Sequence, residues 1–367
     1  MSKVIKVIAL ITTLVIVTTF SVQAIENILT ITQARQESQS SDIDAILAQK
    51  DITELVEAKD QALEDAEDTN VLAGTAETQL NSKVKKYISP LQSQMNIELA
   101  TRNENQRITQ RLVDTEYAYW QLHLATIAID KANLELKIAN NNYESAKIKL
   151  QNGNISANQF TSQKHNVAAK QLKVFEANNN YKKAQYNLNE FLGKELNNNL
   201  NIADNLELKV PKLWSFNTDS LYEKALIVNE NIYKLQKETE FAKMKLQYAG
   251  EEFKTSKDEY LDVATEKEKA DNALVKAKKN LYKSITVDGN SVLSLLENNK
   301  LLELQLKIEQ SNFKAVQLKY NKGAVSKNEY LQANLSLKNI QYQLQSNIAN
   351  LNKSYESFNI KYIYESK

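Results

Sequence analysis

The sequence contains no cysteine, two prolines and six glycines among its 367 residues. A globular chain of this length carries about four times as many glycines and about nine times as many prolines at average usage. Without cysteine, neither a disulfide nor a thiolate metal site can form, so packing must hold the fold. Because glycine and proline mark turns and interrupt helices, their scarcity predicts few turns and long helices.

Residues that carry chemistry are also sparse. His123 and His165 are the only histidines, and no His/Glu pair at helical spacing suggests a metal, so we expect both on the surface or in a helix seam. The sequence has no phosphate-binding loop, nucleophile elbow or dinucleotide fingerprint. One predicted helix carries a cluster of carboxylates that is best explained as a solvated face: Glu57, Asp60, Glu64, Asp65, Glu67 and Asp68. We therefore expect no enzymatic activity, no metal and no cofactor.

The first 24 residues have the pattern of a signal peptide. Lys3 and Lys6 precede an apolar run at residues 7–20, and residues 22–24 offer a small-residue cleavage site. An uncleaved anchor is the alternative, but the run is shorter than the ~20 residues that span a bilayer. Removing this segment leaves 44 basic against 45 acidic residues. Such a balanced, well-mixed charge argues against a nucleic-acid partner, and we expect no membrane span in the mature chain.

The chain is built from an internal repeat. Residues 134–160 align with residues 304–330 without a gap, and nine of the 27 positions are identical. Gly153 coincides with Gly323, and Ser156 coincides with Ser326. Each repeat is predicted to be a helix, a tight turn and a return helix, because glycine suits the left-handed end of a helix and serine caps the next one.

These signals predict where the helices lie. The two hairpins are expected at residues 91–151 with 157–192, and at 292–321 with 327–363. Shorter helical segments at 42–68 and 221–265 precede them, and a capping box of Ser220 with Glu223 is expected before the second. The resulting division is a signal peptide (1–24), a first half with its turn near 153 (25–193), a linker (194–220) and a second half with its turn near 323 (221–367).

The first rising helix carries two apolar series at the 3.5-residue period of coiled coils. The first series is Val113, Tyr117, Trp120, Leu124, Ile127, Lys131, Leu134 and Ile138. The second series is Leu122, Ala125, Ile129, Ala132, Leu136, Ala139, Tyr143, Ala146 and Leu150. Two offset seams predict neighbours on two sides of this helix. Periodicity alone leaves two arrangements open, a closed ring of several copies or a monomeric or dimeric antiparallel bundle.

The order of these motifs resembles the TolC-type outer-membrane efflux family over most of the mature chain. The aromatic-rich stretch 117–125, the turn at 143–156, the hairpin end NLNEFLG at 187–193, the helix LYEKAL at 221–226 and the second turn at 320–326 carry the resemblance. It implies a homotrimeric helical conduit in the cell envelope, at the outer membrane or in the periplasm. The conduit would work with a membrane-fusion adaptor and an inner-membrane exporter. A non-transporting coiled-coil spacer or scaffold in the envelope is the alternative.

The resemblance also implies sites. The family's turns form the lower tips of the tunnel, where the adaptor docks, and the matching residues here are Gly153, Ile155, Ser156, Gly323, Val325 and Ser326. Carboxylates narrow the family's tunnel entrance; the match here is Glu329, whereas Gln332 and Gln159 occupy related positions. The alternatives are ordinary helix capping for the tips and a solvated carboxylate for Glu329.

One part of the family pattern has no evident counterpart. The family inserts a pair of membrane-spanning strands in each half, and a spanning strand needs about 9 to 11 residues. Residues 70–90 are too few for two such strands, and residues 250–289 are charged and helical in character. We therefore expect an all-α chain of two duplicated long antiparallel coiled-coil hairpins, a TolC-like α-barrel protomer without an evident membrane β-barrel.

Overall fold

The computed structural model describes residues 28–72, 74–202 and 205–363. The predicted signal peptide lies outside these residues. Nearly all of the described chain is helical, which confirms the all-α fold class. The elements in chain order are β1 (Ile28–Leu29), α2 (Ile31–Ser40), α3 (Ile43–Glu67), α4 (Ala76–Lys83), the π-helical turn η1 (Val84–Ile88), α5 (Ser89–Gln151), α6 (Ala157–Phe191), β2 (Asn201–Ile202), α7 (Thr218–Val228), α8 (Glu230–Glu252), α9 (Asp258–Asn321) and α10 (Lys327–Tyr362).

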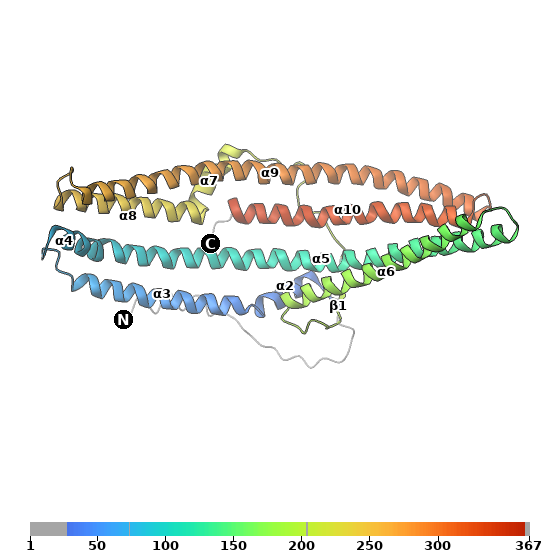
Figure 1. Ribbon diagram of the computed structural model, residues 1–367, viewed down its shortest axis with the longest axis horizontal. Helices are drawn as coiled ribbons and strands as arrows, with labels where there is room; N and C mark the ends of the chain where they lie inside the picture. The colour runs from blue at the N-terminus through green and yellow to red at the C-terminus, as the bar shows by residue number, and fades with distance from the viewer. Residues whose placement is uncertain (1–27, 73, 203–204, 364–367) are drawn as a thin grey trace.

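Two very long helices organise the molecule. Helices α5 and α9 contain 63 and 64 residues, which corresponds to about 95 Å each at 1.5 Å per residue. Shorter helices lie beside each of them, end to end: α3, α2 and α6 along α5, and α8 and α10 along α9 (Figure 1). The result is an elongated wall. Its helices follow the order α6, α5, α10, α9 toward the hairpin turns, and α3, α5, α8, α9 toward the other end.

The two predicted seams of α5 face different neighbours, as expected. In the first seam, the Tyr117 hydroxyl donates to Asn350 Oδ1 of α10 at 2.9 Å, and Lys131 Nζ lies 4.3 Å from the centre of the Tyr342 ring. In the second seam, the ring centres of Tyr143 and Phe160 of α6 are 5.1 Å apart. The two-sided pattern of apolar residues therefore reflects burial on both flanks of α5 within one copy of the chain.

The second half differs from the prediction in several places. Helix α9 begins at Asp258 rather than near 292, and it continues through Gly289. A Cβ atom at Gly289 would clash with the ring of Phe216, so this glycine leaves room for a side chain of the linker and does not end a helix. The segment expected at 221–265 is interrupted at Asn229 and again at 253–257. Asn229 caps α8 by accepting a hydrogen bond from Ile232 N at 3.0 Å.

The predicted capping box of Ser220 with Glu223 is wrong. Helix α7 begins at Thr218, and Asn217 is its cap, because Asn217 Oδ1 accepts a hydrogen bond from Ser220 N at 2.9 Å. Asparagine and serine are both good caps, so sequence alone could not choose between two positions three residues apart.

The linker between the halves packs along the middle of the wall. Lys209 N donates to Asn352 Oδ1 at 2.9 Å, and its ammonium pairs with Glu116 of α5 at 2.5 Å and Glu356 of α10 at 2.6 Å. Trp214 packs edge-on against Phe358 of α10, with ring centres 5.6 Å apart. The linker thus binds the two halves together. Among the described residues, no helix is both long and apolar enough to cross a lipid bilayer.

Candidate functional site: the hairpin tips and the edges of the wall

The two hairpin turns have the same backbone geometry. Gly153 and Gly323 both have φ of 71°. In each turn the glycine N–H bonds the carbonyl three residues back, at 3.0 Å to Leu150 and 2.9 Å to Tyr320, and the next N–H bonds the carbonyl five residues back at 2.8 Å. This pattern satisfies the free carbonyls at a helix end and requires a left-handed residue. No atom lies within 4 Å of a Cβ built on either glycine, so the backbone conformation alone explains the glycines.

Both return helices begin with a capping box. Ser156 Oγ accepts from Gln159 N at 3.2 Å while Gln159 Oε1 accepts from Ser156 N at 2.8 Å. Ser326 and Glu329 make the same pair of bonds at 3.2 and 2.7 Å. The hydrogen bond from the Ser326 backbone lowers the pKa of Glu329. The carboxylate of Glu329 is therefore engaged in capping α10, and its role at a tunnel constriction stays a prediction.

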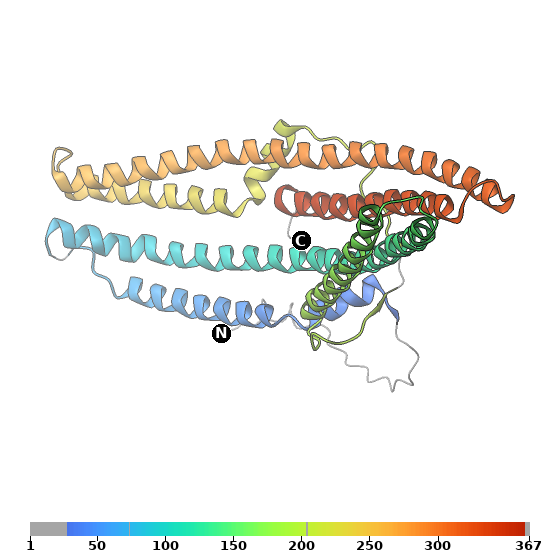
Figure 2. The ribbon, with the colours of Figure 1, turned by 45° about the vertical axis from the view of Figure 1, so that its right-hand side comes forward.

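The predicted docking residues lie on two separate tips at one end of the molecule. Gly153, Ile155 and Ser156 are on the tip of α5 and α6, and the remaining three predicted residues are on the tip of α9 and α10. Figure 2 shows that the two hairpins diverge as they approach their tips, because the first hairpin bends away from the second. The tip glycines and serines are exposed, whereas Ile155 and Val325 are half-buried in their own turns.

A carboxamide cluster joins the two hairpins before they diverge. Asn141 Nδ2 donates to Asn328 Oδ1 at 2.9 Å, and Asn328 Nδ2 donates to Asn142 Oδ1 at 2.6 Å. Sequence analysis missed this link. The only signal was the run of three asparagines at 140–142 in a helix interior, where asparagine is unfavourable.

The two edges of the wall expose apolar side chains at similar distances from the tips. On α6, Leu172 and Phe175 are exposed, Phe175 by 62%. On α9, Leu301, Leu304 and Ile308 are exposed, Leu304 by 58%. At 1.5 Å per residue, the α6 pair lies about 22 to 27 Å from the start of its helix, and the α9 set lies about 20 to 30 Å from the end of its helix. The α6 edge of one copy could therefore meet the α9 edge of a second copy without a shift along the long axis of the molecule.

The opposite half repeats this feature. Helix α3 exposes Ile43, Ile46 and Leu47 near the middle of the molecule. The first half of α9 likewise exposes apolar side chains as it approaches the middle: Val275, Tyr282 and Val287. Both edges thus carry uncovered apolar side chains in the half that ends in the tips and again toward the middle of the molecule.

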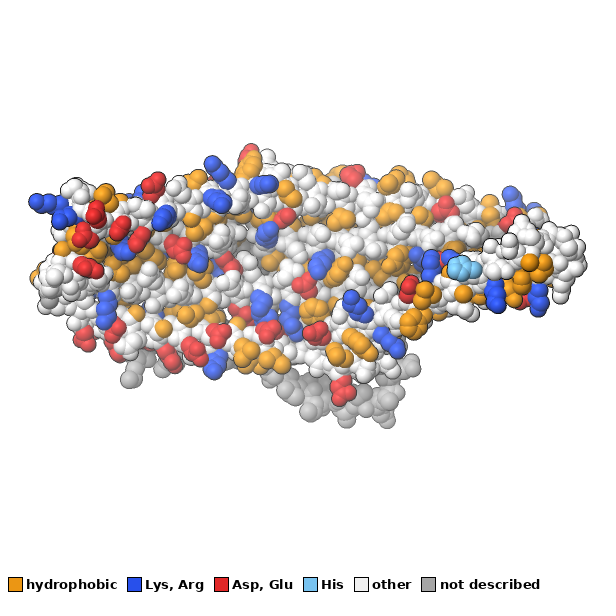
Figure 3. All heavy atoms as spheres, viewed as in Figure 1, with side chains coloured by type: hydrophobic (Ala, Val, Ile, Leu, Met, Phe, Trp, Pro, Cys, Tyr) orange, Lys and Arg blue, Asp and Glu red, His pale blue; other side chains and the backbone are white. Residues whose placement is uncertain are grey.

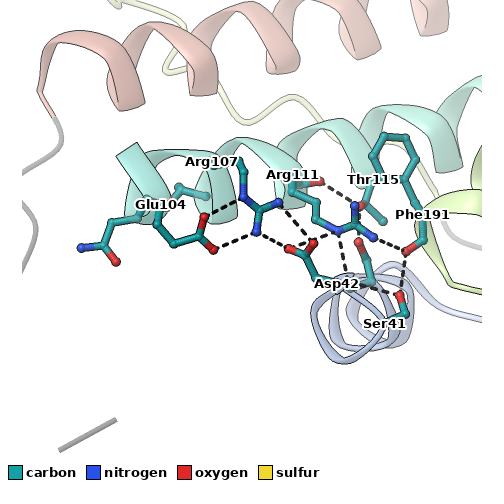
Figure 4. Close-up of polar contacts among 10 residues, drawn as sticks. Ser41, Asp42, Glu104, Arg107, Arg111, Thr115 and Phe191 are labelled. Carbon is teal, nitrogen blue, oxygen red and sulfur yellow. Dashed lines mark hydrogen bonds and ion pairs between the residues drawn. The ribbon is translucent and has the colours of Figure 1, made fainter. Parts of the chain in front are cut away.

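A buried ionic cluster fixes the junction between α2, α3, α5 and α6 (Figure 4). Asp42, whose side chain is 3% exposed, accepts two hydrogen bonds from Arg107, at 2.7 Å from Nη2 and 3.2 Å from Nη1. Arg107 also binds Glu104 through two bonds of 2.8 Å. The bonds to Glu104 and then to Asp42 raise the pKa of Arg107.

Arg111 extends this cluster to the base of the first hairpin. Its Nη2 donates to the carbonyl of Phe191, the last residue of α6, at 3.1 Å, and its Nε lies 3.6 Å from Asp42 Oδ2. Ser41 Oγ donates to the same carbonyl at 3.0 Å. The first hairpin is therefore anchored at its base by charge-assisted bonds, while its tip extends freely.

The described residues contain no group of three or more potential metal-ligating side chains. His165 is exposed on α6, and His123 lies half-buried beside Trp120, as expected for surface and seam positions. Burial lowers the pKa of His123.

Comparisons with known proteins agree with this architecture. No protein-family model and no curated protein sequence matches the chain. The structure is similar to the CmeC outer membrane channel of Campylobacter jejuni, with a TM-score of 0.62, 11% identity, and 90% of this chain and 86% of that chain covered. It is also similar to CusC, with a TM-score of 0.61, 12% identity, and 90% and 91% coverage. The outer membrane protein VceC of Vibrio cholerae gives 0.59, 10% identity, and 91% and 97% coverage.

The chain has the fold of the TolC-type outer-membrane channels. At identities of 10–12%, this likeness defines the fold only. The TolC-type fold confirms the resemblance drawn from the order of the motifs. The residue roles at the two tips of this chain stay predictions.

Proposed function

We propose that this chain is an exported subunit of a homotrimeric helical conduit in the cell envelope, serving an efflux or secretion system. In this proposal the conduit is passive and has no enzymatic activity. Its two kinds of tip, at Gly153 and at Gly323, dock a membrane-fusion adaptor that connects to an inner-membrane exporter. The TolC-type fold supports a channel-like component, and the similar outer-membrane channels offer the analogy.

The observation that carries the proposal is the pair of uncovered edges. A solid bundle would cover its apolar stripes within one copy. Here the apolar stripes of α5 are covered on both sides by other helices of the same copy. The exposed apolar side chains of α6 and α3 on one edge, and of α9 on the other, have no neighbour in the same copy. A rotationally repeated copy would place α6 of one subunit against α9 of the next, and rotation closes such head-to-tail contacts into a ring.

The free energy gained by burying the apolar side chains of these edges is comparable with the cost of association. Fully burying one Leu or Phe side chain is worth about 1.5–3 kcal/mol, so each half-exposed side chain offers about 1 kcal/mol. Summed along both halves of an edge, this exceeds the lower end of the association cost of about 4–15 kcal/mol. Weak assembly through one half alone is therefore expected, and stable assembly requires both halves.

Cysteine cross-linking tests the proposal cleanly, because the chain has no cysteine of its own. A variant with Leu172→Cys on α6 and Leu304→Cys on α9, treated with a short bismaleimide, should give covalent dimers and then closed trimers. A matched control with Leu172→Cys and Leu261→Cys places the second thiol near the far end of α9 and should stay uncross-linked. Equal cross-linking of both variants, or none in the first, would reject the edge-to-edge ring. An assembly that cross-links as expected but has no open centre would favour the alternative, a non-transporting spacer or scaffold.

A further inference from the structure

The linker marks one face of the wall. On α10, Asn352 Oδ1 accepts a hydrogen bond from Lys209 N of the linker at 2.9 Å, and Asn352 Nδ2 donates to the carbonyl of Glu207 at 2.7 Å. On α9, Gly289 lies against the ring of Phe216. Asn352 and Gly289 therefore lie on the face that the linker covers, which we call the linker face. In a closed ring three linkers would crowd the centre, so the linker face is expected outside and the opposite face inside.

The face opposite the linker carries an uncharged polar series on both helices of the second hairpin. A residue nine positions along an α-helix lies on the opposite side, because nine residues make about two and a half turns. Gln343 stands nine positions before Asn352, and Asn298 stands nine positions after Gly289. Heptad spacing keeps further positions on the same face of a coiled-coil helix. The positions at this spacing are Ser284, Ser291, Asn298, Gln305 and Asn312 on α9, and Ser336, Gln343, Asn350 and Ser357 on α10. All nine are exposed or half-buried.

Hydrogen bonds place the two series side by side. Asn298 Nδ2 of α9 donates to Asn347 Oδ1 of α10 at 2.8 Å, and Asn347 stands about one helical turn before Asn350. Asn350 Oδ1 accepts in turn from the Tyr117 hydroxyl of α5 at 2.9 Å. The series on α9 therefore borders the series on α10, and the polar surface continues toward α5.

The two carboxylates of α5 near this face are paired. Asp114 stands two positions before Glu116, which pairs with the linker, so Asp114 lies toward the opposite face. Its carboxylate pairs with Lys353 of α10 at 2.8 Å. Glu135, three heptads after Asp114, pairs with Lys170 of α6 at 2.6 Å. Both carboxylates thus have a counter-charge within the same copy.

The two series end in opposite charges at the hairpin turn. Lys319 follows Asn312 by seven positions, and Glu329 precedes Ser336 by seven positions. Within the two series, charge therefore appears only at the tip.

Nine surface positions without a charge are unusual. Charged residues occupy about 25–35% of a soluble protein surface, so about two or three would be expected. On the linker face of α9, by contrast, Glu303 stands fourteen positions after Gly289, with Lys300 and Lys307 beside it. In Figure 3, few charged side chains appear over α10, whereas many gather over α3 and α8. The two faces of the second hairpin thus differ in charge.

We propose that this uncharged face lines the lumen of the conduit and lets polar cargo pass without selection by the sign of its charge. Asparagine, glutamine and serine both donate and accept hydrogen bonds, so hydroxyl- and amide-rich molecules suit this lining. A lumen of one net charge would instead concentrate molecules of the opposite charge, because a cleft with low-dielectric walls focuses the field. This inference rests on the proposed function, because only a hollow ring has a lumen.

Single-cysteine variants of the mature chain test this inference, because the chain has no cysteine of its own. Gln343→Cys places a thiol on the proposed lumen face. Gln341→Cys is the matched control, because Gln341 is also an exposed glutamine of α10 but stands eleven positions before Asn352, about three turns away on the linker face. In trimers, a maleimide attached to a bulky branched polyethylene glycol should label position 341 and leave position 343 unlabelled.

Small thiol reagents of opposite charge then measure the potential in the lumen. A trimethylammonium-ethyl and a sulfonatoethyl methanethiosulfonate should modify position 343 with the rate ratio of a free thiol in solution, to within about threefold at low and at high salt. Adding Ser346→Glu to Gln343→Cys places a carboxylate about one helical turn away. This change should shift the ratio about tenfold toward the cationic reagent at low salt.

Three results from a trimer would overturn the inference. They are equal labelling of positions 341 and 343 by the bulky maleimide, a rate ratio at position 343 outside the expected range, and no shift of the ratio on adding Ser346→Glu. Light scattering on the same preparations separates the two proposals. A trimer that gives one of these results rejects only the uncharged lumen, whereas a chain that is monomeric rejects the conduit and the lumen with it.

Discussion

Replacing Asp42 by alanine should destabilise the protein more than any other single loss of an ion pair at the base of the first hairpin. Asp42 is almost fully buried and accepts both hydrogen bonds from Arg107, while Arg111 lies 3.6 Å away. Removing one partner of a buried pair costs about 3–5 kcal/mol, because the remaining charge loses its counter-charge. Arg107 is 33% exposed and keeps Glu104, so solvent screening reduces its share. We therefore expect a loss of about 3 kcal/mol.

The assay is urea unfolding of the mature protein followed by circular dichroism. The midpoint should fall while the denaturant slope stays constant, since the folded surface is unchanged. Lys50→Ala is the control, because its pair with Glu54 is largely exposed on both sides, and such pairs contribute about 0–1 kcal/mol. A double-mutant cycle of Asp42→Ala with Arg107→Ala should show coupling. A loss below about 0.5 kcal/mol for Asp42→Ala would refute the view that this cluster anchors the hairpin.

Three further outcomes are expected. Gly153→Ala and Gly323→Ala should each cost about 1–2 kcal/mol in thermal or urea unfolding, from the left-handed backbone alone; a neutral result would mean that the turns can relax. The lowered pKa of Glu329 means that this carboxyl binds fewer protons in the folded protein than in the unfolded protein. Its contribution to the free energy of unfolding is therefore present above its usual pKa of 4.5 and is lost as the pH falls through the lowered pKa. Amide protection factors at the start of α10, which correct for the slower intrinsic exchange in acid, should therefore fall with pH, unlike those at the start of α6, and Glu329→Gln should remove this pH dependence. Asn328→Leu should break both carboxamide bonds between the hairpins and increase the tip-to-tip distance spread measured by spin labels; an unchanged distribution would mean that this cluster does not hold the hairpins together.

Much of the fold could be predicted because its signals are local. The glycine turns at 153 and 323, the serine caps after them and the two seams of α5 all follow from periodicity and capping within a few residues, and the structure has them. Helix α9 was harder, because the sequence predicts its start near 292, whereas the helix begins at Asp258 and continues through Gly289, which leaves room for the distant Phe216. Where two good caps compete, as at Asn217 and Ser220, local chemistry cannot decide.

The contacts at the candidate site join residues far apart in the sequence, so local sequence patterns could not predict them. The bonds among Asn141, Asn142 and Asn328 join residues nearly 190 positions apart, and the ionic cluster at Asp42 joins α3 to α5. The bare flanks at Leu304 and Phe175 could not be distinguished from buried seams by period, because a coiled-coil stripe looks the same whether its neighbour belongs to the same copy or the next.

Electron microscopy of the purified mature protein, with its mass measured by light scattering, tests whether the subunits form a ring. Three copies should surround an open axis, with α6 of each subunit beside α9 of the next. A monomer whose α6 and α9 flanks stay in water at micromolar concentration, or a cylinder whose centre is filled by side chains, would contradict it.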